Sequence, residues 1–221
     1  MDAAHWDAAY GRLGTHGVSW YRADERASLD LLARVPQVPR SAIDVGGGAA
    51  GLAATLLRAG IADVAVLDIS GHALAAARTE HGGPSGPVDW IEADVRDWRP
   101  ERTWDLWHDR AVFHFMADEA DRAGYRRALA AALGRGGHVI AAAFAPDGPD
   151  RCSGLPVCRY GPHDLVAALG ADLVMIAAAR EVHVTPSGSE QPFTWVLARR
   201  RGDGRPPPRP RGTAAVPIRR S

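Results

Sequence analysis

The sequence of this 221-residue chain predicts an α/β fold: a doubly wound, mostly parallel seven-stranded sheet with a C-terminal antiparallel hairpin strand and an N-terminal helical cap. Three observations lead to this prediction. From residue 41 onward, short apolar runs alternate with helical segments, which is typical of a parallel sheet. A glycine-rich turn follows the first of these runs. At the C-terminal end two strand-like runs follow each other with no helix between them, which predicts a hairpin instead of another crossover unit.

Each strand of the parallel part is expected to be a short apolar run. These runs cover residues 41–45, 64–68, 88–91, 104–108 and 138–145. The segments between them carry helix caps at their starts and glycines at their ends, which predicts helices over residues 52–59, 70–80 and 118–133.

The C-terminal part predicts one more helix and the hairpin. Gly161-Pro162 opens the helix and Gly170 closes it. The two hairpin strands are expected over residues 173–178 and 193–199, and residues 185–189 supply the turn region between their extensions.

The chain divides into a domain and a tail. Residues 1–199 are expected to form a single domain, with residues 1–40 as the helical cap and residues 41–199 as the core. The clearest helix of the cap covers residues 24–34. Residues 200–221 hold seven arginines, one acid and five prolines, a composition that predicts a disordered basic tail.

The composition excludes several function classes. All 26 basic residues are arginine, so chemistry that requires a lysine, such as a Schiff base or a Walker-type phosphate site, is not available. No apolar run approaches the ~20 residues of a membrane helix, and the N-terminus does not read as a signal peptide. The body before residue 200 has 19 arginines against 25 acids, which argues against a nucleic-acid-binding face. We therefore expect a cytoplasmic protein that binds neither membrane nor nucleic acid.

The glycine-rich turn reads Asp44-Val45-Gly46-Gly47-Gly48-Ala49-Ala50-Gly51. Glycines allow the chain to turn sharply from strand to helix and to approach a ligand closely, and the following helix offers free N–H groups. The literal spacing G-x-G-x-x-G also describes dinucleotide sites, so the turn alone leaves that possibility open.

Three carboxylates narrow the choice of ligand. Asp68 closes the second strand, 22 residues after Gly46, where it can accept hydrogen bonds from both hydroxyls of a ribose. Asp94 follows the third strand and can accept from an adenine amino group, with Val95 supplying backbone contacts. Asp44 would repel a pyrophosphate, whereas it would attract S-adenosylmethionine (SAM), which carries an ammonium and a sulfonium group.

These motifs resemble those of the seven-β-strand, Rossmann-like (class I) SAM-dependent methyltransferases. The similar segments occur in family order over residues 1–199: Ile43-Asp44-Val45-Gly46-Gly47-Gly48, Val66-Leu67-Asp68-Ile69-Ser70, Glu92-Ala93-Asp94-Val95 and Gly136-Gly137-His138-Val139-Ile140. Two positions depart from the family pattern, since Ala50 replaces a glycine and Arg135 a proline. Neither change removes a side chain that the cofactor needs.

The resemblance implies SAM as cofactor and a set of binding residues. Beyond the acids named above, this set consists of Trp20, Gly46, Gly47, Gly48, Ile69, Asp109 and Arg110. The N-terminal segments Trp6-Asp7-Ala8-Ala9-Tyr10 and Val18-Ser19-Trp20-Tyr21 are similar to a branch of small bacterial enzymes and protein-lysine methyltransferases. In that branch Trp20 and Tyr21 would close over the cofactor; the alternative is that they only pack the cap against the sheet.

The acceptor site is expected over the carboxyl edge of the sheet, beneath the cap. His114 is the candidate general base, because the ordinary pKa of histidine lies near neutrality; the alternative is a histidine that only packs there. The loop over residues 144–160 carries both cysteines, Cys152 and Cys158, which we expect to be separate reduced thiols and not metal ligands.

The function that these features predict is transfer of a methyl group from SAM to an oxygen, nitrogen or sulfur nucleophile of a small molecule. A protein-lysine acceptor is the alternative that the resemblance leaves open. An NAD-dependent oxidoreductase and a non-catalytic SAM-binding protein are the alternatives from other classes. The sequence gives no information on the oligomeric state.

Overall fold

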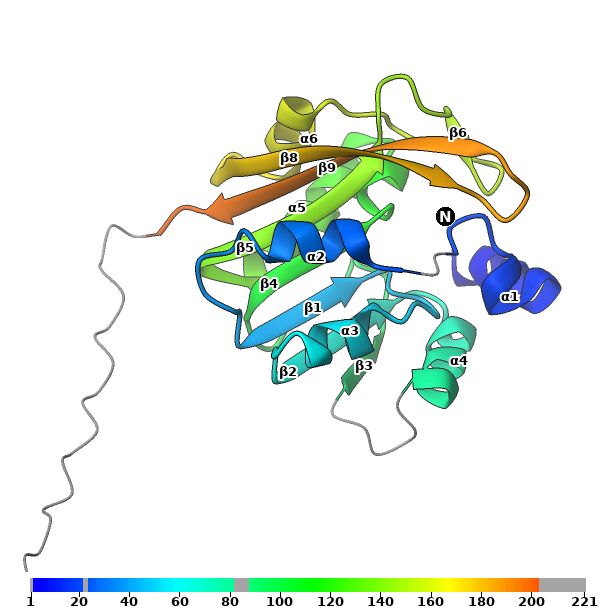
Figure 1. Cartoon of the computed structure of the whole chain (residues 1–221), viewed down its shortest axis with the longest axis horizontal. Helices are drawn as coiled ribbons and strands as arrows, with labels where there is room; N and C mark the ends of the chain where they lie inside the picture. Colours follow the sequence, from blue (N-terminus) through cyan, green and yellow to red (C-terminus); the bar gives the residue numbers. More distant parts are fainter. Residues whose placement is uncertain (1, 22–23, 82–87, 203–221) are drawn as a thin grey trace, which may run out of the picture.

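The computed structural model describes residues 2–21, 24–81 and 88–202. Its main sheet has seven strands in the order β3-β2-β1-β4-β5-β9-β8 (Figure 1). The strands are β1 (Ser41–Val45), β2 (Asp63–Asp68), β3 (Val88–Glu92), β4 (Trp104–Arg110), β5 (Leu133–Phe144), β8 (Leu173–Val184) and β9 (Glu190–Arg200). All neighbours from β3 to β5 are parallel, and β9 runs antiparallel to both β5 and β8. This arrangement confirms the fold class and the inserted antiparallel strand.

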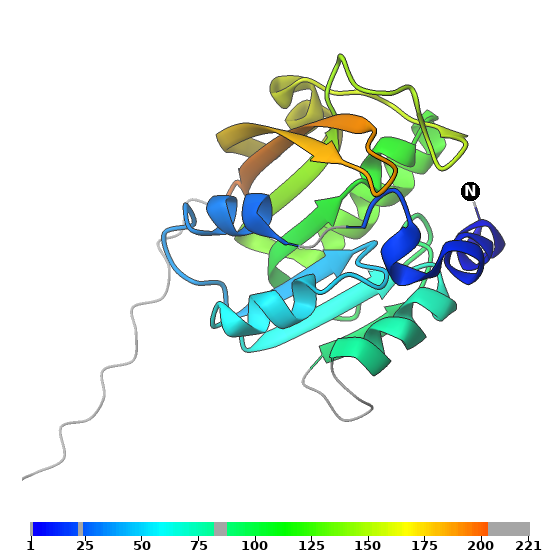
Figure 2. The ribbon, with the colours of Figure 1, turned by 45° about the vertical axis from the view of Figure 1, so that its right-hand side comes forward.

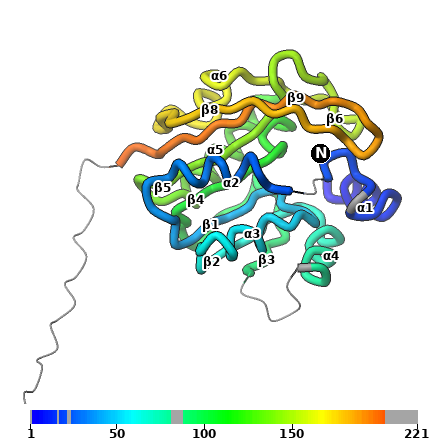
Figure 3. Tube along the Cα trace, in the orientation of Figure 1, coloured from blue at the N-terminus to red at the C-terminus, as the bar shows by residue number. Residues whose placement is uncertain are grey.

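Helices cover both faces of the sheet. They are α1 (Ala3–Gly17), α2 (Arg26–Leu32), α3 (Leu52–Arg58), α4 (Gly71–His81), α5 (Glu119–Ala132) and α6 (Pro162–Leu169). The tube in Figure 3 shows α2 and α3 on one side of the sheet and α5 on the other. Helix α1 lies beside α4 at the carboxyl end of the parallel strands (Figure 2).

The alternation of side chains along each strand builds two cores. Ile43 and Val45 of β1 belong to the core beneath α5 and α6, together with Tyr125 and Leu165. Ala42 of the same strand belongs to the core beneath α2, α3 and α4. Successive residues of a strand point to opposite faces, so a strand buried on both faces must be apolar almost throughout.

Beyond the hairpin, whose strands β8 and β9 include their expected extensions, two strands of the parallel part are clearly longer than the sequence predicts. β4 continues to Arg110, beyond the expected end at residue 108, and β5 begins at Leu133 instead of residue 138. The sequence reads as loop in both places because charged residues and glycines are poor strand formers. Pairing with β5 nevertheless extends through Asp109 and Arg110.

Two small elements lie outside the predicted pattern. A 3-10 turn, η1 (Phe113–Phe115), follows β4. A short hairpin of β6 (Arg151–Cys152) and β7 (Leu155–Pro156) folds part of the loop that was expected to be irregular. No helix among the described residues is both long enough and apolar enough to cross a membrane. The expected tail lies outside the described residues from position 203 onward, while Arg200 still belongs to β9.

Candidate functional site

A cavity of about 760 Å³ opens at the carboxyl ends of β1, β2 and β4. This volume lies within the range that small-molecule and cofactor sites occupy. Its lining comes from the glycine turn after β1, from the ends of β2 and β4, from the segment after β3, and from the cap. Of the residues expected to bind the cofactor, the lining contains Trp20, Asp44, Gly46, Gly47, Asp68, Ile69, Asp94, Val95 and Arg110.

The glycine turn has no room for side chains. Gly46 has a positive φ of 68°, and a Cβ atom there would overlap the side chain of Val112. A Cβ atom on Gly47 would lie 2.5 Å from Oδ2 of Asp44, and one on Gly48, which has a φ of 52°, would overlap the hydroxyl of Tyr10. The glycines therefore serve both the left-handed backbone and the close approach of neighbouring groups.

Asp68 is a buried carboxylate at the end of β2. It accepts a hydrogen bond from the backbone N–H of Ser70 at 2.8 Å. Burial raises the pKa of Asp68 to about 6, and the negative charge of Asp44 adds to the increase. Hydrogen bonds from the backbone N–H groups of the turn oppose it. An acid held in this way can accept further hydrogen bonds from a polar ligand that enters the cavity.

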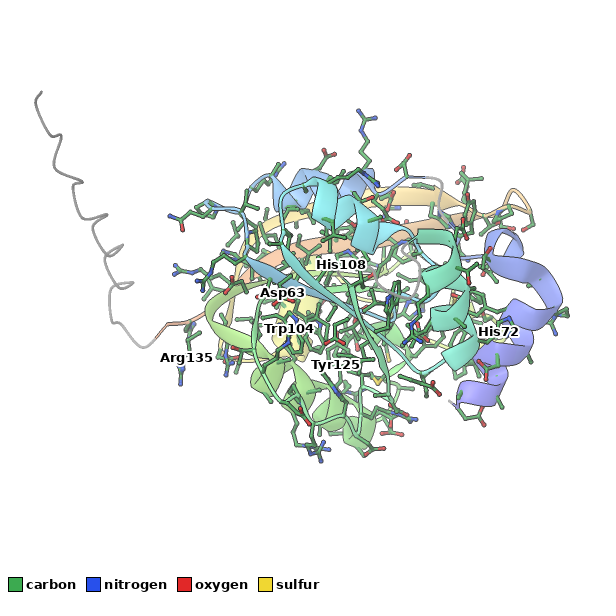
Figure 4. All side chains as sticks on the ribbon, turned by 90° about the horizontal axis from the view of Figure 1, so that it is seen from below. Asp63, His72, Trp104, His108, Tyr125 and Arg135 are labelled. Atoms are coloured by element: carbon green, nitrogen blue, oxygen red, sulfur yellow. The ribbon has the colours of Figure 1, made fainter. Side chains whose placement is uncertain are left out.

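Asp44, on β1, is joined to two other buried side chains. Its Oδ1 lies 2.7 Å from Nδ1 of His108, which stands near the end of β4. The other ring nitrogen, Nε2, lies 3.0 Å from the hydroxyl of Ser28 on α2. Figure 4 shows His108 in the interior of the molecule. Through these two hydrogen bonds, α2 of the cap is connected to Asp44 at the start of the glycine turn. Asp44 and His108 both line the cavity.

Asp94 lies after β3 and is held by Arg96. The guanidinium group contacts both carboxylate oxygens, with Nη2 at 2.5 Å from Oδ2, and it also reaches Asp121. Burial alone would raise the pKa of Asp94, but the hydrogen bonds and charge of Arg96 lower it overall. The carboxylate is thus fixed in position at the rim of the cavity, next to Val95.

Aromatic residues of the cap close the other side of the cavity. The indole N–H of Trp20 donates to the hydroxyl of Tyr10 at 3.0 Å, and the two rings meet edge to face. Trp6 packs edge to face against both Trp20 and Phe115. Burial raises the pKa of Tyr10 to about 12, so its hydroxyl keeps its proton. Tyr21 also belongs to the lining.

The structure separates Asp109 from Arg110, which were expected together. Because β4 continues through both residues, their side chains point to opposite faces of the sheet. Arg110 faces the cavity, where it donates to the carbonyl of Trp20 at 2.8 Å. Asp109 points into the core beneath α5 and is fully buried. The expectation that Asp109 lies at the cofactor is therefore corrected.

The partners of Asp109 explain its role. It accepts hydrogen bonds from the backbone N–H groups of Val112 and Phe113, at 2.8 and 3.0 Å, and from the hydroxyl of Tyr125. That hydroxyl accepts in turn from the indole of Trp107. Burial raises the pKa of Asp109 to about 6. The carboxylate stabilises the turn that leads into η1, and Tyr125, which belongs to α5, is labelled in Figure 4.

His114 is likewise not brought to the cavity. Its ring is fully buried between Phe115 and Phe144, at centroid distances of 4.5 and 4.8 Å. Neither ring nitrogen has a hydrogen-bond partner among the described residues. Burial, and then the charge of Arg110, lower the pKa of His114 to about 3. A general base must reach the proton that it removes, so this geometry does not support His114 in that role.

Both cysteines are free thiols. Cys152 is buried and lines the cavity, and burial raises the pKa of its thiol to about 11. Cys158 follows later in the same loop, and its Sγ lies 3.9 Å from the carbonyl oxygen of Met116. Within residues 2–21, 24–81 and 88–202, no group of three or more metal-ligating side chains is placed to hold an ion.

Several residues of the site were not assigned to it from the sequence. Tyr10, Phe115 and His108 line the cavity, and Ser28 supports it from α2. For His108 a signal was present, because ligands of open α/β sheets bind at the carboxyl ends of the strands and His108 stands near such an end. Nothing in the sequence marks Ser28, since its partner lies 80 positions away.

Comparisons with known proteins find similarity to methyltransferases. Residues 42–137 match the family model of a methyltransferase domain. Over 98 residues the chain is 37% identical to trans-aconitate 2-methyltransferase from Rhizobium etli, which covers 43% of the chain. The chain spans only 37% of the length of that relative.

Solved structures share the fold. A SAM-dependent methyltransferase from Anabaena variabilis superimposes with a TM-score of 0.69 at 17% identity, covering 90% of this chain and 95% of the other. N-methyltransferase NodS from Bradyrhizobium japonicum, in complex with S-adenosyl-L-homocysteine (SAH), gives a TM-score of 0.67 at 14% identity, with 88% and 97% covered. At such identities the similarity establishes the fold alone.

Proposed function

We infer that this chain belongs to the Rossmann-like (class I) family of SAM-dependent methyltransferases and uses SAM as its cofactor; the methyltransferase domain model that matches residues 42–137 and the similar fold support this inference. We propose that the protein transfers the methyl group of SAM to a small molecule that carries a carboxylate. The observation that carries the proposal is the cavity itself, where the glycine turn, three fixed acids and an arginine converge.

The residues of the cavity fit the cofactor. When bound, SAM supplies a methyl group on a cationic sulfonium, together with an ammonium group. Asp68 would accept hydrogen bonds from the ribose hydroxyls, and Asp44 would attract the ammonium group. Asp94 and the backbone of Val95 would hold the adenine. The absence of side chains at Gly46 and Gly48 lets Val112 and Tyr10 pack directly against the turn, and the backbone of Gly46 and Gly47 lines the cavity.

The choice of acceptor follows from the histidine, cysteine and tyrosine side chains that the cavity offers as bases. An acceptor that arrives protonated needs a base, whereas one that is already anionic does not. His108 is the only histidine in the described lining, and both of its ring nitrogens are hydrogen-bonded. The raised pKa values of Cys152 and Tyr10 keep these groups protonated. A carboxylate, with an ordinary pKa of about 4, arrives ionised at neutral pH.

Two further observations support a carboxylate. Arg110 places a positive charge in the cavity, close enough to Cys152 to affect its electrostatics. Curated relatives from Rhizobium etli and Rhizobium rhizogenes bear the name trans-aconitate 2-methyltransferase, which denotes an acidic small molecule as acceptor. We also place the protein in the cytoplasm, because its two free thiols fit a reducing compartment.

The test is a transfer assay with methyl-labelled SAM, small di- and tricarboxylic acids, and the matching amides. We expect label in methyl esters, which base hydrolyses to methanol, and no label on the amides. Arg110→Gln should raise KM for the acid about tenfold to a hundredfold, because a charge-assisted contact is lost. Arg58→Gln is the matched control, since Arg58 also lines the cavity and is also bonded within the protein, to Thr55, but comes from α3 instead of β4.

Other outcomes would select the alternatives. Label on a lysine-containing peptide but not on the acids would replace the small-molecule reading with a protein-lysine methyltransferase. SAM binding without transfer to any acceptor of the panel would favour a non-catalytic SAM-binding protein.

A further inference from the structure

Three hydrogen-bonded side chains, Asp44, His108 and Ser28, form a buried row. They come from three different elements, β1, β4 and α2 respectively. All three side chains are nearly inaccessible to solvent, with residue exposures of 3%, 2% and 2%. Polar groups buried to this degree are costly unless they are bonded to one another. The row satisfies both ring nitrogens of His108, at 2.7 and 3.0 Å.

For a neutral His108 ring next to an ionised Asp44, the chemistry of the partners fixes the direction of the hydrogen bonds. An ionised carboxylate can only accept, so Nδ1 of His108 carries the proton that points to Asp44. The neutral imidazole then has its lone pair on Nε2, and the hydroxyl of Ser28 donates to it. Asp44 thereby selects the tautomer, and the hydroxyl of Ser28, which can donate or accept, satisfies the remaining ring nitrogen.

The Asp44 carboxylate is held on both sides. Oδ1 is bonded to His108, and Oδ2 lies so close to Gly47 that a Cβ atom there would approach it to 2.5 Å. The negative charge of Asp44 is close enough to Asp68 to raise the pKa of that carboxyl group further. Two negative groups at one end of a cavity repel each other, and a cationic ligand relieves that repulsion.

We propose that His108 is a positioning residue: it orients the Asp44 carboxylate toward the ammonium group of the cofactor's amino-acid portion, and Ser28 holds the ring in the orientation that does so through its hydrogen bond to Nε2. The proposal rests on the proposed function, because it requires SAM as the ligand. It also makes α2 of the cap part of the cofactor site, although Ser28 itself does not line the cavity.

Two near-isosteric substitutions of His108 test separately the hydrogen bond of Nδ1 to Asp44 and that of Nε2 to Ser28. In His108→Asn the amide nitrogen takes roughly the place of Nδ1 and can still donate to Asp44. In His108→Gln the amide group takes roughly the place of Nε2, so Asp44 loses its partner. We expect His108→Asn to bind SAH within about threefold of the unchanged protein, and His108→Gln to bind it about tenfold to a hundredfold more weakly.

A second ligand distinguishes positioning from damage to the fold. 5′-Methylthioadenosine keeps the adenine and ribose but lacks the amino-acid portion, so its affinity should be the same in all variants. Calorimetric titration of the full chain measures both ligands. Equal affinity of His108→Gln and the unchanged protein for SAH would overturn the proposal, as would a parallel loss of 5′-methylthioadenosine binding.

Two measurements keep the proposal testable if the His108 variants do not fold. Side-chain ¹⁵N NMR of the unchanged protein should show His108 protonated on Nδ1 alone; protonation on Nε2 alone would overturn the assignment. Ser28→Ala should weaken SAH binding several-fold and leave 5′-methylthioadenosine unaffected. If the unchanged protein binds neither ligand, the proposed function fails, which is distinguishable from every outcome that concerns His108.

Discussion

The pH dependence of cofactor binding should follow the protonation of Asp68. In the protein without ligand, burial raises the pKa of this carboxyl group to about 6. Ribose hydroxyls donate hydrogen bonds to the ionised form, which stabilises it and lowers the pKa in the complex. Below pH 6, binding must therefore release a proton, and the affinity should rise as the pH rises toward 7.

The magnitude follows from the pKa. At pH 5, one unit below a pKa of about 6, roughly one-eleventh of the groups are ionised. The dissociation constant for SAH should thus be about tenfold larger at pH 5 than at pH 7, which corresponds to about 1.4 kcal/mol. Asp109 has a pKa of about 6 as well, but it does not line the cavity, so its titration should be the same with and without ligand.

The assay is calorimetric titration at pH 5, 6 and 7, in buffers with different ionisation enthalpies that report the number of protons released. Asp68→Asn is the matched control: it should bind more weakly at pH 7 and show little change with pH. An affinity for SAH that is constant from pH 5 to pH 7 in the unchanged protein would refute the reasoning.

Three substitutions test the structural roles assigned to other residues, each by chemical denaturation together with SAH binding. Gly46→Ala should lower the free energy of unfolding by clearly more than Gly154→Ala, which should cost about 1 kcal/mol; both have positive φ, but only the first methyl group meets another side chain. Equal costs would contradict the packing at the turn. His114→Leu should leave the free energy of unfolding unchanged or raise it, because it removes a buried imidazole that has no hydrogen-bond partner in the described part of the chain. Loss of methyl transfer in a folded His114→Leu variant would instead support His114 as a base. Tyr125→Phe should lower the free energy of unfolding by about 1.5–3 kcal/mol, because the buried carboxylate of Asp109 loses a hydrogen bond. A denaturation curve with the same midpoint and the same slope as that of the unchanged protein would show that this hydrogen bond does not contribute to stability.

The parallel part of the sheet could be predicted from the sequence because its strands are buried on both faces and are therefore continuously apolar. The strand expected at residues 41–45 agrees with β1 (Ser41–Val45), and the helix expected at residues 52–59 agrees with α3 (Leu52–Arg58) to within one residue. The glycine turn and the acids near the ends of β1, β2 and β3 were predictable for a similar reason. Their positions follow from the ends of strands that the pattern already locates.

The end of β4 could not be predicted, because its polar residues are accommodated only by distant partners. His108 bonds to Ser28, 80 positions earlier, and Arg110 to the carbonyl of Trp20, 90 positions earlier. Without these partners, three consecutive polar residues indicate a loop, in which Asp109 and Arg110 could face one ligand. Once they form a strand, the alternation of side chains sends them to opposite faces, and the position of Asp109 changes with it.

The central claim is that the cavity binds SAM, and competing calorimetric titrations with SAM and NAD(H) test it most directly. The account predicts that the unchanged protein binds SAM, that Asp68→Ala weakens this binding by about 1–3 kcal/mol, and that NAD(H) gives no measurable heat. Binding of NAD(H) by a folded protein that does not bind SAM would contradict the account and establish the oxidoreductase reading in its place.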